Sequence, residues 1–108
     1  MIARVWRGAT LAENGDAYAA YIEETGMREA REIPGNRGTL VLRRMRGGYT
    51  EFETIMLFDK LEDVRAFAGD ELEVAVFFDL DDKYLVERDL EVRHYEADVR
   101  LEPVSTAR

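Results

Sequence analysis

Hydrophobic and polar residues alternate along four segments of the chain, as they do in strands that bury one face. In the first segment Ile2, Arg4 and Trp6 share one face. A Gly47-Gly48 pair separates the two middle segments and is typical of a β-hairpin turn. The four predicted strands span residues 2–8, 39–46, 49–58 and 90–100.

Two other segments have the spacing of amphipathic helices. Residues 15–31 carry an apolar stripe, with Gly26 weakening its second half, and residues 61–68 carry a shorter stripe that ends at Gly69. Residues 70–78 are expected to add a separate helical turn, and residues 79–89 form a charged connection whose structure the pattern leaves open. The first stripe consists of Tyr18, Tyr21, Ile22, Met27 and Ala30.

The resulting order, β-α-β-β-α-β, predicts an α+β domain of the ferredoxin-like type over residues 1–100, followed by a tail at 101–108. In this fold both helices cover one face of a four-stranded antiparallel sheet, so the other face is bare. That face is expected to carry Trp6, Phe52, Met56 and Phe58, or the residues that alternate with them. Either set is too apolar to remain in water, so we expect a homodimer whose two sheets meet.

Composition narrows the choice of partners. The chain has 108 residues, which suits one domain, and 23 acidic against 15 basic residues give a net charge of −8. This charge disfavours nucleic acid and anionic membranes as partners. The absence of cysteine excludes disulfides and thiolate chemistry. With neither a signal peptide nor a long apolar run, the expectation is a soluble cytoplasmic protein.

Four motifs taken together resemble a known group of proteins. They are MIARVWRG at 1–8, PGNRGTLVLRR at 34–44, FETIMLFDKLEDVRAFAG at 52–69 and HYE at 94–96. In order and spacing they are similar to the dimeric α/β-barrel superfamily, in particular to its antibiotic biosynthesis monooxygenase-like (ABM) group. The resemblance covers about residues 2–97. It implies a homodimer with a ligand cleft between each sheet and its own helices, or within the joined barrel.

The resemblance also implies two kinds of function. Some members are cofactor-independent monooxygenases acting on small aromatic or polyketide-like molecules, others degrade haem, and many have no known activity. The oxygenases commonly carry a Trp at the end of the third strand and an Asn four residues earlier; the matching positions here are Phe58 and Thr54. Haem-degrading members hold iron with a histidine on the second helix, whereas the only histidine here is His94, in the last predicted strand. We therefore expect no cofactor.

The candidate chemistry rests on His94 and on arginines within strands. A base or proton shuttle would use His94, because its ordinary pKa lies near neutrality; the alternative is a structural strand histidine. Arg4, Arg43 or Arg44 could enter the cleft and steady an anion, with Arg44 taken as the catalytic candidate. The alternative for these arginines is a cross-strand ion pair, with Glu51, Glu53 or Glu96 as the available carboxylates.

Besides Arg4, the candidates for substrate binding are Trp6, Asn36, Thr54 and Phe58. Trp6 and Phe58 could stack on a flat ligand or belong to the core. Asn36 could orient a substrate oxygen or serve a left-handed turn. The acidic residues between 70 and 82 lack the spacing of a calcium loop, so no metal site is expected. Two hypotheses remain: a cofactor-independent oxygenase, and a non-catalytic dimeric domain that binds a small molecule or responds to stress.

Overall fold

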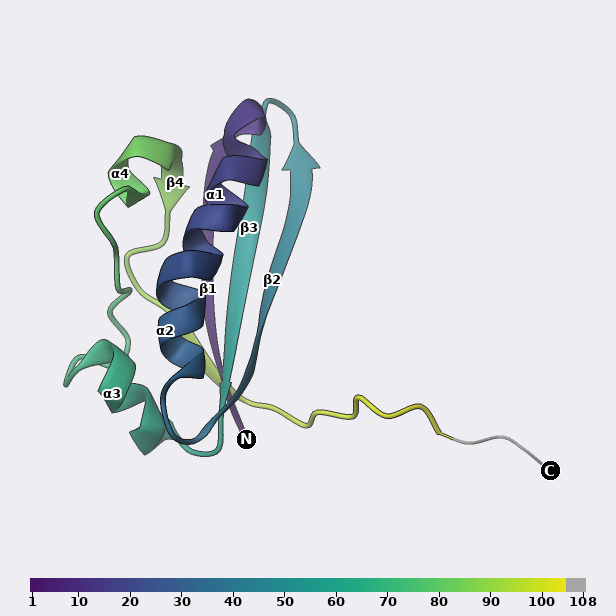
Figure 1. Cartoon of the computed structure of the whole chain (residues 1–108), viewed down its shortest axis with the longest axis vertical. Coiled ribbons are helices and arrows are strands. Elements are labelled where there is room, and N and C mark those ends of the chain that lie inside the picture. The colour runs from purple at the N-terminus through teal and green to yellow at the C-terminus, as the bar shows by residue number, and fades with distance from the viewer. Residues whose placement is uncertain (105–108) are drawn as a thin grey trace.

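A computed structural model describes residues 1–104 and places a long helical segment and two shorter helices against one antiparallel sheet (Figure 1). The strands are β1 (Ile2–Leu11), β2 (Asn36–Arg46), β3 (Tyr49–Phe58), β4 (Leu85–Arg88) and β5 (Arg93–Glu96). The helices are α1 (Gly15–Ile22), α2 (Arg28–Arg31), α3 (Arg65–Ala68) and α4 (Asp81–Tyr84). Short 3-10 turns at Ala12–Asn14 and Leu61–Val64 precede α1 and α3.

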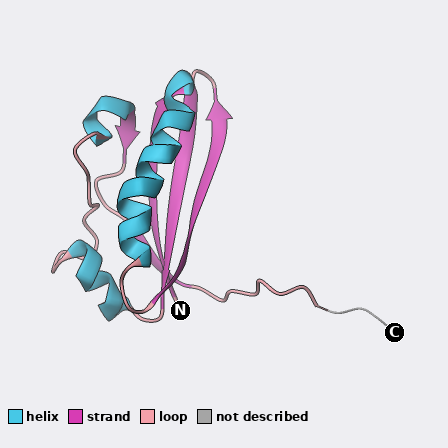
Figure 2. Ribbon diagram, in the orientation of Figure 1, coloured by secondary structure: helices cyan, strands magenta, loops and turns pink. Residues whose placement is uncertain are grey.

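The sheet has the order β2-β3-β1, and β4 and β5 both pair with the outer edge of β1. Every pairing is antiparallel. All helices lie on one side of the sheet, which confirms the ferredoxin-like α+β prediction (Figure 2). The fourth strand position is shared by two short strands instead of one long strand.

One π turn joins α1 and α2 into a continuous helical segment over residues 15–31. The turn spans Glu23–Met27 and adds one residue to a helical turn, so that Ile22 and Met27, five positions apart, are both buried. The predicted helix therefore forms over its full length. Its irregularity coincides with Gly26, the residue that weakened the helical pattern.

Two predictions for the C-terminal third are wrong. Residues 70–78 form no helix, and the strand expected at 90–100 is shortened to β5, whereas β4 forms within the charged connection expected at 79–89. The reason is a pairing between distant residues. The backbone N–H of Ala75 donates to the carbonyl oxygen of Leu90 at 2.9 Å, and that of Val92 donates to Glu73 at 2.7 Å. The backbone groups at 73–75 therefore bond to residues 90–92 and not within a helix of their own.

Side chains between the sheet and the helices form two buried clusters. One lies around Trp6, Tyr18 and Phe52, and the other around Met56 and Phe58. Trp6, Phe52, Met56 and Phe58 thus face the helices. Of the two sets proposed for the bare face, the alternating residues are the ones that lie there.

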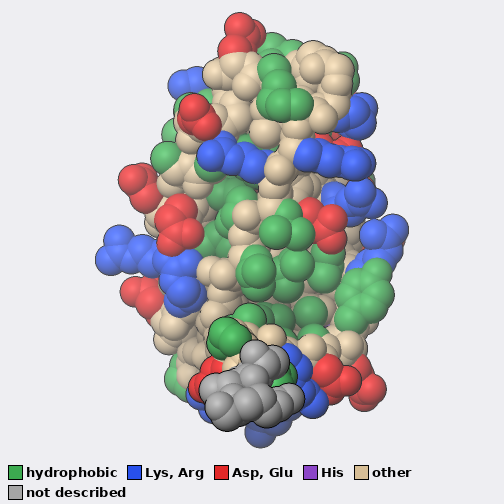
Figure 3. Space-filling model, turned by 90° about the vertical axis from the view of Figure 1, so that its right-hand side faces the viewer, with side chains coloured by type: hydrophobic (Ala, Val, Ile, Leu, Met, Phe, Trp, Pro, Cys, Tyr) green, Lys and Arg blue, Asp and Glu red, His purple; other side chains and the backbone are tan. Residues whose placement is uncertain are grey.

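The uncovered face of the sheet has an apolar centre. Val5 and Ile55 pair across β1 and β3, and Ile55 pairs with Leu40 on β2. The side chains of Leu40, Leu42 and Tyr95 on this face are 43–50% exposed. Figure 3 shows hydrophobic side chains in the middle of this face, surrounded by charged ones. The segment after β5 leaves the body of the molecule close to the N-terminus (Figure 1).

Within residues 1–104 no helix has the length and apolar character needed to cross a membrane. In the same range, no group of three or more histidine, aspartate or glutamate side chains could hold a metal ion. The domain boundary at residue 100 stays a prediction, and positions 105–108 of the expected tail lie outside the described residues.

Candidate functional site

A cavity lies between the helix-covered face of the sheet and the helices, at the junction of the two buried clusters. Its volume is about 60 Å³. The sheet contributes Arg4, Trp6 and Thr54 to its wall, and the π turn contributes Thr25 and Gly26. The irregular segment at 69–80 closes the cavity with side chains that include Val76, Phe77 and Phe78. The cavity wall is therefore largely apolar, with a few polar groups at defined positions.

Arg4 is a buried cation in this wall, only 3% exposed. Its guanidinium donates to the carbonyl oxygens of Leu72 and Val74, the latter at 3.0 Å, both on the segment that closes the cavity. Burial lowers the pKa of Arg4 to about 10, and the nearby charge of Glu73 opposes this shift. Arg4 therefore remains charged at neutral pH, although none of the ion pairs formed among residues 1–104 involves it.

His94 contacts Arg4 and does not line the cavity. Its Nε2 lies 3.2 Å from Nη1 of Arg4. Burial lowers the pKa of His94, and the charge of Arg4 lowers it further. The ring is thus neutral at pH 7, and Nε2 accepts a hydrogen bond from the guanidinium. The lone pair that a general base would use already serves to hold Arg4.

Trp6 and Thr54 form the floor of the cavity as a cross-strand pair on β1 and β3. The indole N–H of Trp6 donates to the carbonyl oxygen of Asp89 at 2.8 Å, and its ring meets that of Phe77 edge-on at 6.2 Å. Thr54 is 6% exposed, and its hydroxyl forms no hydrogen bond within residues 1–104. This hydroxyl is a free polar group beside an aromatic floor.

A buried hydrogen bond marks the opposite wall, where α1 meets the start of α4. The hydroxyl of Tyr18 donates to Oδ1 of Asp81 at 2.9 Å, and the backbone N–H of Phe78 donates to Oδ2 at 2.7 Å. Burial raises the pKa of Tyr18, and the charge of Asp81 raises it further. The tyrosine therefore stays protonated and acts as a donor. The cavity thus contains one cation and one carboxylate on separate elements.

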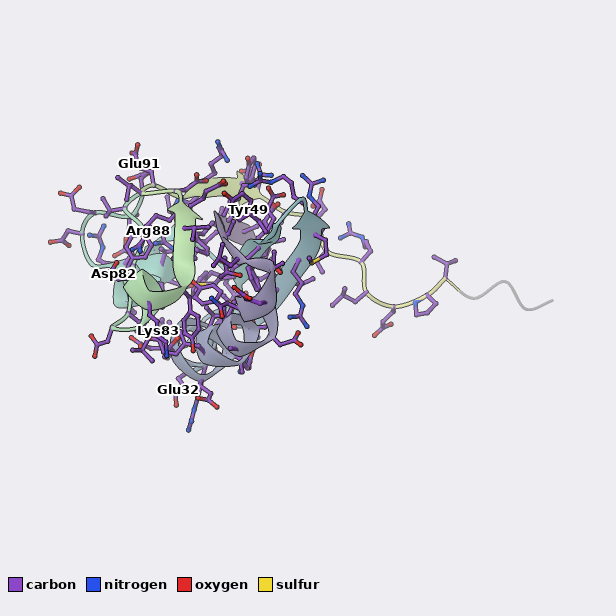
Figure 4. All side chains as sticks on the ribbon, turned by 90° about the horizontal axis from the view of Figure 1, so that it is seen from above. Glu32, Tyr49, Asp82, Lys83, Arg88 and Glu91 are labelled. Carbon is purple, nitrogen blue, oxygen red and sulfur yellow. The ribbon has the colours of Figure 1, made fainter. Side chains whose placement is uncertain are left out.

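An arginine supports the outer side of the closing segment. The guanidinium of Arg88 lies 4.7 Å from the centre of the Phe77 ring and forms an ion pair with Asp82 at 2.8 Å. Figure 4 shows Arg88 and Asp82 on the side of the molecule formed by α4 and β4. The position of Phe77 is thus fixed from the cavity side by Trp6 and from outside by Arg88.

The remaining predicted site residues lie elsewhere. Arg44 is exposed and pairs with Glu51 at 2.7 Å, which is the cross-strand alternative left open for it. Phe58 is fully buried in the second cluster and does not line the cavity. Asn36 begins β2 with its side-chain oxygen accepting the N–H of Gly38 at 2.8 Å, as in a turn. The structure therefore brings together Arg4, Trp6 and Thr54, with His94 behind Arg4.

The sequence analysis missed the opposite wall. The pattern places Tyr18 in the apolar stripe of the helix, and Asp81 in a charged connection and among the acidic residues that lack calcium-loop spacing. No local signal separates Asp81 from Asp79 or Asp82, because its burial depends on a contact with α1, 63 residues away in the chain. The weakness of the helical pattern at Gly26 was the one available signal for the π turn. Such turns inside helices frequently lie at functional sites.

Comparison with known proteins bears on the fold. No protein-family model matches the sequence, and no curated protein matches it at a significant level. Among solved structures, a candidate antibiotic biosynthesis monooxygenase from Bacillus cereus matches with a TM-score of 0.68 and 12% identity, over 97% of this chain and 98% of that chain. The chain therefore has an ABM-like fold.

Proposed function

We propose that this protein binds a small, flat aromatic or polyketide-like molecule carrying an anionic oxygen, in the cavity between its sheet and helices. Arg4 is the observation that carries the proposal: it is a buried, charged group in the cavity wall, and no carboxylate of residues 1–104 forms an ion pair with it. A buried charge is costly unless it is paired. A carboxylate, phenolate or enolate of the ligand would provide the missing partner.

The aromatic part of the ligand is inferred from the side chains around Arg4. Trp6 and Phe77 present ring faces and edges, and Phe78 lies against Gly26 of the π turn. An apolar cavity of about 150 Å³ holds a benzene-sized molecule, and the volume here is about 60 Å³. We infer that a ligand of this size enters as part of the segment at 69–80 moves outward. An anion can do so, because it competes with the Leu72 and Val74 carbonyls for the Arg4 guanidinium.

The catalytic form of this proposal is a cofactor-independent oxygenation. A substrate CH₂ group next to a carbonyl loses a proton to water, and the carbanion reacts with O₂ and takes a proton back to give a hydroperoxide. Loss of water then leaves a new carbonyl group, so one oxygen atom enters the product and the other leaves as water. Arg4 would stabilise the enolate, and His94 would hold Arg4 in place. The Bacillus cereus neighbour, described as a candidate monooxygenase, supports this form as a fold-level analogy only.

Calorimetric titration with 2-naphthoate and with its uncharged amide tests the binding proposal. We expect the carboxylate to bind at least tenfold more tightly than the amide, and Arg4→Gln to remove that preference. Arg43→Gln is the matched control, since Arg43 is an exposed strand arginine paired with Asp16. The single indole N–H resonance of Trp6 reports whether the ligand enters this cavity. Equal affinity for the acid and the amide, or no shift of the indole resonance, would contradict the proposal.

Oxygen uptake with a panel of anthrones and hydroquinones separates the catalytic form from its alternative, a non-catalytic binding domain. Turnover that Arg4→Gln abolishes supports the oxygenase. Binding without turnover on any member of the panel supports the non-catalytic domain. Two observations favour that second reading: Thr54 and Phe58 replace the Asn and Trp that the resemblance associates with oxygenation.

We also propose that the protein is a homodimer joined through the uncovered face of the sheet. The apolar centre around Leu40, Leu42 and Ile55 supports this pairing, as does the charged border around it. Analytical ultracentrifugation should give a dimer at micromolar concentration. Leu42→Glu should shift it to monomer, whereas Val86→Glu, at an equally exposed position on β4, should not. A wild-type monomer in this range would contradict the dimer. Arg44, on the same face, could reach a ligand only between two such sheets.

A further inference from the structure

The Tyr18–Asp81 pair gives the cavity a second polar end, on different elements from Arg4. Asp81 is 4% exposed and lines the cavity, and no arginine, lysine or histidine of residues 1–104 forms an ion pair with it. It accepts one hydrogen bond at each carboxylate oxygen, from Tyr18 and from the Phe78 backbone. Each oxygen of a carboxylate can accept two. Half of the accepting capacity of this buried carboxylate is therefore unused.

A structural role accounts for only part of this arrangement. The bond from the Phe78 N–H to Oδ2 closes the turn that leads into α4. The bond to Tyr18 serves no turn, because it joins α1 to a segment 63 residues away, and both partners line the cavity. Tyr18 is the donor in this bond, so Asp81 is the acceptor at Oδ1.

Thr54 adds a further polar group to this space. It is 6% exposed and lines the same cavity. The floor of the cavity therefore offers a donor and acceptor in addition to the Arg4 cation and the Asp81 acceptor.

We propose that Asp81 selects ligands by accepting a hydrogen bond from a hydroxyl group, so that the preferred ligand is a hydroxylated aromatic acid. The anionic oxygen binds at Arg4 and the hydroxyl at Asp81, with the ring between them beside Trp6. This inference rests on the proposed binding function and makes it more specific. It also assigns the polar contact opposite Arg4 to Asp81 and not to His94, whose Nε2 is held by Arg4 outside the cavity wall.

Three rigid ligands test the inference by calorimetric titration: 2-naphthoate, 6-hydroxy-2-naphthoate and 6-methoxy-2-naphthoate. In the wild type we expect the hydroxy acid to bind at least tenfold more tightly than either of the others. A site that hydrogen-bonds a ligand hydroxyl discriminates strongly against analogues that lack it. In Asp81→Asn this preference should fall to threefold or less, while 2-naphthoate still binds.

Tyr18→Phe is the second variant, because it keeps the carboxylate and frees its Oδ1. The preference for the hydroxy acid should persist or increase in this variant, which keeps the inference testable if Asp81→Asn does not fold. A hydroxyl preference below threefold in the wild type, a preference unchanged in Asp81→Asn, or its loss in Tyr18→Phe would overturn the inference. If the three acids bind equally in an Arg4-dependent way, only this inference fails. If none of them binds, the proposed function fails with it.

Discussion

Replacing Arg4 by methionine tests whether the hydrogen bonds of Arg4 hold the segment at 69–80 in place over the cavity. Methionine has a similar length and no charge, so it preserves much of the packing. The substitution leaves the carbonyl oxygens of Leu72 and Val74 without their donor. It also leaves Nε2 of His94 without the guanidinium that contacts it at 3.2 Å.

Two opposing terms determine the change in the free energy of unfolding. Two buried carbonyl groups without a partner cost about 1–3 kcal/mol each, or about 2–6 kcal/mol together. Against this, burial lowers the pKa of Arg4 to about 10, roughly 2.5 below its ordinary value. A pKa unit corresponds to about 1.4 kcal/mol, so replacing the buried charge by an uncharged side chain restores about 3 kcal/mol to the free energy of unfolding. The global free energy of unfolding should therefore fall by less than about 3 kcal/mol.

The local effect should be larger than the global one. Once the Arg4 bonds are lost, the segment can open and its carbonyl groups can bond to water. Hydrogen exchange should therefore accelerate by about 100-fold at the backbone N–H groups of Ala75 and Val92, which bond the segment to residues 90 and 73. Exchange in β3 should change only as much as global stability does.

Denaturant unfolding combined with hydrogen exchange measures both quantities on one variant. Arg43→Met is the control, because Arg43 pairs with Asp16 in solvent and should change neither quantity by more than about 0.5 kcal/mol. If exchange at Ala75 and Val92 accelerated no more than exchange in β3, Arg4 would not fasten the segment. A global loss clearly above about 3 kcal/mol would show that the desolvation relief had been overestimated.

Three further predictions concern pH and two glycines. The pKa of His94 is lower in the folded state than in the unfolded chain, so the unfolded chain takes up a proton first as pH falls, and the free energy of unfolding should decrease below about pH 6.5. In His94→Gln the free energy of unfolding should vary less with pH between 6.5 and 5. An unchanged pH dependence in that variant would exclude this role of His94. In Gly26→Ala the new Cβ lies 3.2 Å from Phe78. The affinity for 2-naphthoate, measured by calorimetry, should fall at least threefold, while the free energy of unfolding from thermal denaturation changes by no more than about 1 kcal/mol. An unaltered affinity would mean that the ligand does not contact this part of the cavity wall. Gly35→Ala places a Cβ 2.4 Å from the Asp63 carboxylate at a φ of 95° and should cost about 1–3 kcal/mol in denaturant unfolding, and no measurable loss would show that the turn adapts.

The sequence pattern was most informative where contacts are local. The strand at 49–58 forms over the predicted residues, because alternation at a period of two depends only on neighbouring positions. The helical segment over 61–68 and its end at Gly69 follow for a similar reason, since Gly69 takes a φ of 75° that favours glycine. The prediction fails between 70 and 92, where the backbone pairing joins residues 15 and 19 positions apart (75 with 90, and 73 with 92). Periodicity within either segment carries no information about this pairing.

The same distinction between local and distant contacts decides which residues of the candidate site could be predicted. Trp6 could be identified from its predicted strand position, and Thr54 from its match to the Asn position of the ABM resemblance. Arg4 could be identified because an arginine on a buried strand face needs an anionic partner. Period-two alternation could not decide which face is buried, since both sets of residues are apolar, and so Arg44 remained an equal candidate. Asp81 was beyond prediction, because only its tertiary contact with Tyr18 distinguishes it from its acidic neighbours.

The position of Arg4 couples the charge of a ligand to its entry into the cavity. The residue that would bind an anion is also the residue that holds the cavity closed, through the Leu72 and Val74 carbonyls. An uncharged aromatic molecule would have to break these bonds and offer nothing to the guanidinium in return, whereas an anion replaces neutral acceptors with a charged one, and charge-assisted hydrogen bonds are about twice as strong. Neutral His94 leaves that charge on Arg4 uncompensated, so the guanidinium is available to an anion at neutral pH. Below the folded-state pKa of His94, a second positive charge beside Arg4 would destabilise the closed segment before any ligand arrives.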